Sequence, residues 1–210
     1  MKTDIILAGV GGQGILSIAT VIGFAAVNKN LNIKQAEVHG MSQRGGAVYS
    51  HLRLSDRQIA SDLIPSCGSD LIISIEPMEA LRYVPYLTPD GWLITNTQPF
   101  INIGNYPARE SLMEQLNAVK NKVLIDADGL ASQCGSIKAS NMVMLGAASP
   151  FTNIEPEELE KAIATIFERK GKDTVAVNIR AMQAGYGVAV NSVPRLPRTR
   201  KPTAEIISKL

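Results

Sequence analysis

The chain has 210 residues and a net charge of +2; 45% of its residues are apolar and 19% are charged. This length supports one domain with its own core, without stabilising disulfides or metal. The 17 glycines and 5% aromatic residues favour an α/β fold with tight turns. The small net charge gives no attraction for a polyanion, so we expect no nucleic-acid partner.

Cysteine use and hydropathy predict a reducing, aqueous environment. Cys67 and Cys134 lie too far apart for a CxxC motif and are too few for a disulfide framework. The short apolar run before Gly9 does not resemble a secretion signal, and no apolar stretch reaches the roughly 20 residues that span a bilayer. We therefore expect a cytoplasmic protein with no membrane partner.

The N-terminal part predicts a β-α-β unit followed by a hairpin. Apolar runs indicate a buried strand over 5–8, a helix over 15–27 and a second strand over 33–38. Two short segments, 47–54 and 59–64, are separated by a four-residue polar turn, which predicts an antiparallel hairpin. We therefore expect a mixed sheet.

The remaining elements complete a three-layer α/β/α, Rossmann-like fold with a mostly parallel sheet. Strands are expected near 70–76, 90–96 and 121–128, and helices at 77–87, 139–148, 155–170 and 174–190, with a helix stop at Ser149 and Pro150. We assign residues 1–190 to one domain. Residues 191–210 form a basic, proline-rich tail, interpreted either as a mobile surface segment or as an arm on a partner subunit.

A glycine turn, "GVGGQG" at 9–14, follows the first strand. Its spacing matches G-x-G-x-x-G, in which glycines allow a tight turn and close approach of a phosphate at a helix N-terminus. Glu37 lies where a ribose-binding acid would follow, although Gln13 is unusual in such a turn. A bound dinucleotide, another anion and a purely structural turn all remain open. The residues concerned are Gly9, Gly11, Gly12, Gln13 and Gly14.

A second loop, "HGMSQRGG" at 39–46, offers a guanidinium and two hydrogen-bonding side chains beside flexible glycines. An α/β protein can present an anion-binding or interface group in this way. The alternative is a surface turn with a solvated arginine. The candidate residues are Met41, Ser42, Gln43, Arg44, Gly45 and Gly46.

Four motifs together are more specific than either loop. "GVGGQG" at 9–14, "GMSQRGGAVYSHLR" at 40–53, "NMVMLGA" at 141–147 and "VNIRAMQAGY" at 177–186 resemble the gamma subunit or domain of the 2-oxoacid:ferredoxin oxidoreductases. The resemblance is greatest to the beta subunit of indolepyruvate ferredoxin oxidoreductase. It covers most of residues 4–187 and leaves out the tail.

The resemblance implies a non-autonomous subunit of an enzyme that oxidatively decarboxylates a 2-oxoacid to an acyl-CoA and passes electrons to ferredoxin. It places thiamine diphosphate, Mg²⁺ and iron–sulfur clusters in a large partner subunit, with CoA as co-substrate. Two separated cysteines cannot supply the thiolates of a cluster. Arg44 then faces a carboxylate or phosphate of substrate or CoA, or an acidic group of the partner. No residue is assigned a catalytic role, and the particular 2-oxoacid remains open.

Other polar residues favour structural roles. Alternation along the strand places His51 on the same face as Tyr49 and Arg53. We favour a polar sheet face or a subunit contact for His51 over a titrating residue near the cofactor pocket. His39 adjoins the second loop. "DADG" at 126–129 could bind magnesium, but a strand-end turn and helix cap is favoured.

Two other functions remain as alternatives. A free-standing NAD(P)- or flavin-nucleotide-binding dehydrogenase would use the glycine turn, although little chain is left for a substrate domain. An interaction scaffold would use both loops only for docking. A homodimer of the isolated chain is plausible if its partner-binding surface is exposed.

Overall fold

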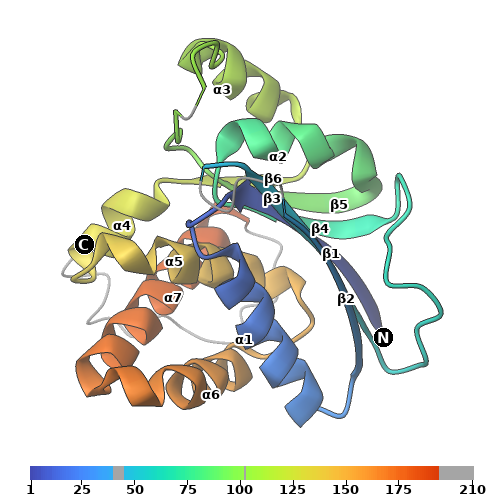
Figure 1. Ribbon diagram of the computed structural model, residues 1–210, viewed down its shortest axis with the longest axis vertical. Coiled ribbons are helices and arrows are strands. Elements are labelled where there is room, and N and C mark those ends of the chain that lie inside the picture. Colours follow the sequence, from blue (N-terminus) through green and yellow to red (C-terminus); the bar gives the residue numbers. More distant parts are fainter. Residues whose placement is uncertain (40–44, 102, 194–210) are drawn as a thin grey trace.

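The computed structural model describes residues 1–39, 45–101 and 103–193. These residues form a six-stranded sheet in the order β2-β3-β1-β4-β5-β6 (Figure 1). Pairs β1/β4, β4/β5 and β5/β6 are parallel, as expected for an α/β fold. The strands are β1 (Lys2–Val10), β2 (Asn32–His39), β3 (Ala47–Ser55), β4 (Ser69–Ser74), β5 (Leu87–Asn96) and β6 (Lys122–Ile125).

Strand β3 makes the sheet mixed, because it pairs antiparallel with both β1 and β2. The mixed sheet is therefore confirmed, but the predicted hairpin between 47–54 and 59–64 is wrong. The hairpin joins β2 to β3 instead. The Arg53 guanidinium binds the carbonyls of Ser61 at 3.0 Å and Leu63 at 2.9 Å. Two carbonyls of segment 59–64 are thus hydrogen-bonded to the Arg53 side chain and not to a neighbouring strand, and the segment forms no strand.

The predicted β-α-β unit is present but split. Helix α1 (Ile15–Asn28) connects β1 to β2, and these strands run in the same direction because each is antiparallel to β3. Strand β3 lies between them, so β1 and β2 are not neighbours. Residues of β2 therefore lie one strand farther from the glycine turn than they would beside β1.

Helices cover both faces of the sheet, which gives the predicted three layers (Figure 1). Ile5 and Leu7 of β1 point into the larger core, and the intervening Ile6 points into the smaller one. The larger core is covered by α1, α4 (Ala127–Gln133), α5 (Ser140–Ala148), α6 (Pro156–Phe167) and α7 (Lys172–Ser192), and the smaller by α2 (Pro77–Tyr83) and α3 (Arg109–Ala118).

The predicted C-terminal helices are confirmed as α5, α6 and α7. A 3₁₀ turn at Ser149–Phe151 follows α5, in agreement with the predicted stop, and another at Glu168–Lys170 extends α6 to Gly171. Gly171 has φ of +92°, a left-handed conformation that suits glycine. None of the helices within the described ranges has both the length and the apolar character needed to cross a membrane.

Candidate functional site

The glycine turn connects β1 to α1 and is closed by its own glutamine. A Cβ on Gly9 would lie 2.7 Å from Ile15 Cδ1 and 3.0 Å from Gln13 Oε1, so a larger residue there would displace these side chains. Gln13 Oε1 accepts a hydrogen bond from the Val10 N–H at 2.8 Å, and the Gln13 N–H donates to the Val10 carbonyl at 3.1 Å. Gln13 therefore stabilises the turn.

The glycine turn and the second loop meet at one edge of the sheet. The Gly11 N–H donates to the Gly46 carbonyl at 2.8 Å, and the Gly45 N–H donates to the Gly11 carbonyl at 3.4 Å. The end of the second loop therefore lies directly on the turn. Its remaining candidate residues, Met41, Ser42, Gln43 and Arg44, lie outside the described residues, as does Gly40.

The geometry disfavours a dinucleotide in the usual orientation. Glu37, the candidate ribose-binding acid, lies on edge strand β2, and β3 separates it from β1 by one additional strand spacing of about 4.8 Å. Its carboxylate accepts a hydrogen bond from Gln35 Nε2. The Gly11 N–H, at the position where a pyrophosphate would approach, is already bonded to Gly46.

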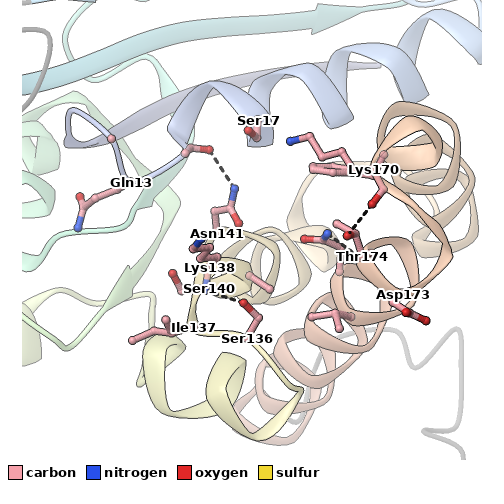
Figure 2. Close-up of a pocket in the computed structure, with 16 residues that line it drawn as sticks. Gln13, Ser17, Ser136, Ile137, Lys138, Ser140, Asn141, Lys170, Asp173 and Thr174 are labelled. Carbon is pink, nitrogen blue, oxygen red and sulfur yellow. Dashed lines mark hydrogen bonds between the residues drawn. The ribbon is translucent and has the colours of Figure 1, made fainter.

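A pocket of 760 Å³ opens on the other side of the glycine turn, between the starts of three helices (Figure 2). This volume is in the range of small-molecule sites. The first turn of α1, the segment before α5 and the first turns of α7 form its walls. The lining residues are Gly12, Gln13, Gly14, Ser17, Ser136, Ile137, Lys138, Ala139, Ser140, Asn141, Phe167, Lys170, Asp173, Thr174, Val177 and Asn178.

The electrostatics of this pocket favour an anion. Helices α1 and α5 both begin at the pocket, and neither has a side-chain N-cap or an acidic residue in its first turn. Their positive dipole ends therefore face the pocket and favour a negative group. The Ser17 N–H of α1 already donates to the Gly14 carbonyl, and the Ser140 N–H of α5 already donates to the Ile137 carbonyl. Lys138 and Lys170 add two cations, and Lys170 Nζ lies 4.9 Å from the Phe167 ring centroid. Asp173 is the one acidic side chain among the lining residues.

The third glycine of the turn packs against the "NMVMLGA" segment. Gly14 has φ of +84°, and a Cβ there would lie 2.6 Å from Asn141 Nδ2. The same nitrogen donates to the Gly14 carbonyl at 3.2 Å. Figure 2 shows this hydrogen bond between the first turn of α1 and the start of α5. Two motifs that are 127 residues apart in sequence thus form one wall of the pocket.

A buried carboxylate orders the loop after β5. Glu76 is fully buried and caps α2 by accepting from the Glu79 N–H at 2.8 Å. Its other oxygen accepts from the Phe100 N–H at 3.4 Å and from the Tyr106 hydroxyl. Burial and the interaction with Glu76 raise the pKa of Tyr106, which therefore remains protonated. The loop between β5 and α3 is thus anchored to α2.

His51 is a buried structural residue. It lies on the face predicted by alternation, but residues 59–64 cover that face, and His51 is 5% exposed. Its Nδ1 accepts a hydrogen bond from the Ile64 N–H at 2.8 Å, and its ring lies 5.7 Å from that of Tyr49. Burial, and then the charge of Arg53, lower its pKa. The side chain of His39 lies outside the described part of the structure.

The helix-cap interpretation of "DADG" is confirmed. Asp126 caps α4, and its carboxylate accepts from the Gly129 N–H at 2.9 Å. Within residues 1–39, 45–101 and 103–193, no three His, Cys, Asp or Glu side chains gather as a metal site.

The two cysteines are separate thiols. Cys67 is exposed, with its Sγ 3.6 Å from the Pro85 carbonyl, and Cys134 is half-buried. Burial raises the pKa of Cys134, so its thiolate is disfavoured.

Sequence reasoning found the glycine turn but missed the residues opposite it. Lys138 and Lys170 belong to none of the four motifs, and Lys170 is the last residue of the helix predicted over 155–170. Asn141 begins the "NMVMLGA" motif, which by itself predicts no role for its side chain. The shared signal was a pair of helix starts that lack acidic residues, at Gly14 and at Ala139.

The described site defines an α/β protein in which two joined loops and an anion-attracting pocket flank the carboxyl end of the central strand. Residues 4–188 match the model of the family described as "Pyruvate ferredoxin/flavodoxin oxidoreductase". The chain belongs to this oxidoreductase family. The resemblance carried by the four motifs is thereby confirmed.

Curated relatives cover nearly the whole chain. The "Indolepyruvate oxidoreductase subunit IorB" of Archaeoglobus fulgidus is 35% identical over 92% of this chain and 98% of its own length. The protein of the same name from Methanothermobacter thermautotrophicus is 35% identical over 91% of this chain and 100% of its own. A "2-oxoglutarate synthase subunit KorC" from Methanocaldococcus jannaschii is 28% identical over 90% of this chain and 95% of its own.

Solved structures share the fold. The 2-oxoglutarate:ferredoxin oxidoreductase from Magnetococcus marinus, described with 2-oxoglutarate, coenzyme A and succinyl-CoA bound, has a TM-score of 0.74 and 21% identity. The match covers 96% of this chain but 33% of that one, so the fold is one part of a longer polypeptide there. The gamma subunit of a keto/oxoacid ferredoxin oxidoreductase from Geobacter sulfurreducens has a TM-score of 0.66 and 21% identity, covering 90% of this chain and 99% of that one.

Proposed function

We propose that this chain is the smaller subunit of a 2-oxoacid:ferredoxin oxidoreductase that acts on indolepyruvate or a related aryl pyruvate. The observation that carries the proposal is the 35% identity to indolepyruvate oxidoreductase subunits over nearly their full length. In the complex, the 2-oxoacid is oxidatively decarboxylated to an acyl-CoA, and the electrons pass to ferredoxin.

The carboxyl edge of the sheet is the surface we assign to the large subunit. The glycine turn and the second loop lie there, and the loop after β5 adds apolar side chains to the same edge. Phe100 is 44% exposed, Ile101 71% and Ile103 40%. Neighbouring exposed apolar residues of this kind support a protein interface.

The pocket beside the glycine turn is the site we assign to CoA. A phosphate of CoA would lie at the positive end of α1 and pair with Lys138 and Lys170. Phe167 and Ile137 offer apolar surface in the same pocket. The chain then holds CoA, while Arg44 and its loop act toward substrate, CoA or the partner.

Thiamine diphosphate, Mg²⁺ and the iron–sulfur clusters belong to the partner in this proposal. Cys67 and Cys134 are the chain's only cysteines, and one cluster uses about four thiolates. When bound to the partner, thiamine diphosphate supplies the carbanion chemistry. This subunit's residues bind and orient CoA and exclude water from the shared site.

Co-expression with a thiamine- and cluster-binding large subunit tests the proposal. We expect a stable complex that reduces ferredoxin with indolepyruvate and CoA, and no activity from either chain alone. A large subunit that reaches full activity without this chain would contradict the proposal. Micromolar binding of NADH, NADPH or FAD to the isolated chain would instead favour a dehydrogenase.

Arg44→Ala separates a site role from a docking role for the second loop. If Arg44 contacts substrate or CoA, the variant complex assembles and loses turnover. If Arg44 contacts an acidic group of the partner, assembly itself is lost. Size-exclusion chromatography of the co-expressed chains, followed by ferredoxin reduction, distinguishes the two outcomes.

A further inference from the structure

We propose that Asn141 is a specificity-determining residue of the pocket, whose carboxamide oxygen accepts a hydrogen bond from an N–H or O–H group of the bound ligand. The inference rests on the proposed function, because it treats CoA as the ligand. It adds a requirement beyond negative charge, since the site would select a phosphorylated compound that also carries hydrogen-bond donors.

Of the two polar atoms of the Asn141 carboxamide, only the nitrogen makes a hydrogen bond within the described residues. The side chain is 7% exposed, and its Nδ2 donates to the Gly14 carbonyl at 3.2 Å. Its Oδ1 is buried and has no hydrogen-bond partner within the described structure. Rotating the amide by half a turn would place this oxygen against the Gly14 carbonyl, so two acceptors would face each other. The contact with Gly14 therefore fixes which side presents the oxygen.

An acceptor buried in this way is an exception that needs a partner, because most buried polar atoms in proteins are hydrogen-bonded. Asn141 lies at the first turn of α5, beside Ser140 and opposite the first turn of α1 in the pocket wall (Figure 2). Lys138 and Lys170 supply donors for acceptors on the ligand. Asn141 Oδ1 supplies the complementary function, an acceptor for a donor on the ligand.

These two functions define the ligand class. Ionised phosphate oxygens only accept hydrogen bonds, so they match Lys138 and Lys170 but not Asn141 Oδ1. CoA carries phosphates together with an adenine amino group, hydroxyl groups and amide N–H groups. Inorganic pyrophosphate carries the charge without amino, amide or alcohol donors and is the matched probe.

Isothermal titration of the full-length chain with CoA and with pyrophosphate tests the inference. In Asn141→Leu, which keeps the side-chain size but removes the acceptor, we expect the Kd for CoA to rise about tenfold. The Kd for pyrophosphate should not change. Asn141→Ala, which also removes the acceptor, serves as a second variant if the leucine prevents folding, which thermal unfolding of each variant reports.

Each other result overturns the inference. An unchanged CoA affinity means that water satisfies the oxygen, and a parallel loss for both ligands means that Asn141 only maintains the pocket wall. Wild-type chain that binds pyrophosphate but no CoA contradicts the assignment of CoA and this inference together. If the variant binds CoA more weakly and pyrophosphate as tightly as the wild type does, the result supports the CoA assignment and the role of Asn141.

Discussion

At the scale of single residues, Gly14 is constrained by its backbone and by its neighbour. Its φ of +84° disfavours any side chain, and Asn141 Nδ2 occupies the space where a Cβ would lie. We expect Gly14→Ala to lower the free energy of unfolding by about 2–4 kcal/mol, from backbone strain and overpacking together. Urea denaturation measures this loss.

Gly12 provides the matched control. Its φ of +101° imposes backbone strain, but no atom lies within 4 Å of an added Cβ. Gly12→Ala should therefore cost only the strain, about 1–2 kcal/mol. Equal losses in the two variants would mean that the contact between Gly14 and Asn141 does not constrain the turn.

His51 predicts a pH dependence of stability. Its ordinary pKa of 6.5 is lowered in the folded chain, chiefly by burial and then by Arg53, against smaller opposing effects of Asp62 and Asp4. The unfolded chain therefore binds a proton more readily below pH 6.5, so the free energy of unfolding falls as the pH decreases from there toward the lowered pKa. This stabilisation is fully present above pH 6.5.

His51→Asn removes the titrating group and keeps an acceptor for the Ile64 N–H. Urea unfolding of both proteins at pH 7.5, 6.5 and 5.5 gives the test. We expect the wild type to lose stability relative to the variant only at the lower pH values. A constant difference across this range would contradict the buried, neutral state of His51.

At the scale of elements, the crossing of α5 and α7 depends on two glycines. A Cβ on Gly146 would lie 1.8 Å from the Met182 carbonyl oxygen, and one on Gly185 would lie 1.9 Å from that of Val143. We expect Gly146→Ala to force the helices apart and to cost about 3 kcal/mol or more. Thermal unfolding followed by circular dichroism measures the effect.

Gly187, on the partner helix α7, is the control for that variant. No atom lies within 4 Å of its added Cβ. Gly187→Ala should stabilise the chain by about 0.5–1 kcal/mol, because alanine has the higher helix propensity. Destabilisation by both substitutions would indicate that glycine flexibility, rather than helix contact, is needed in this region.

Periodicity predicted the elements well but not all of their pairings. Ile5, Leu7 and Ile6 alternate between two cores, so β1 was readable from its apolar run. The strands that pair with β3 could not be predicted, because the sequence of segment 59–64 is typical of a strand. In the structure its carbonyls bind Arg53 instead. The residue pattern of 59–64 does not show that its carbonyls bind a guanidinium instead of pairing with a neighbouring strand.

The sequence predicted the glycine-turn side of the pocket but not the side formed by the segment before α5 and the start of α7. The glycine spacing identified the turn, and the order of motifs identified the family. Asn141 and Lys170 reach the turn through the packing of α5, α6 and α7, which depends on contacts between residues far apart in sequence. Neither helical periodicity nor glycine spacing contains this information.

At the scale of the whole molecule, the exposed apolar loop after β5 predicts where the large subunit binds. We expect Ile101→Glu to weaken capture of the co-expressed large subunit while leaving the thermal unfolding temperature unchanged, because Ile101 is 71% exposed. Val27→Glu is the control. Val27 is 61% exposed but lies in the last turn of α1, about 18 Å along the helix from its start.

Equal capture by both variants would place the partner elsewhere. The same edge also bears on self-association, since the isolated chain leaves these side chains in water. If it forms the homodimer considered from the sequence, sedimentation velocity should show a dimer that Ile101→Glu dissociates.

The position of β3 has a consequence for slow opening motions of the chain. Strand β1 is enclosed between β3 and β4, whereas β2 lies at the sheet edge, so amide hydrogen exchange should be slowest in β1 and faster in β2. The Gly11 amide is unusual because its protection depends on the Gly46 carbonyl across the two loops. Its exchange rate therefore reports how often the loops separate, which makes it a direct signal for anything that binds across them.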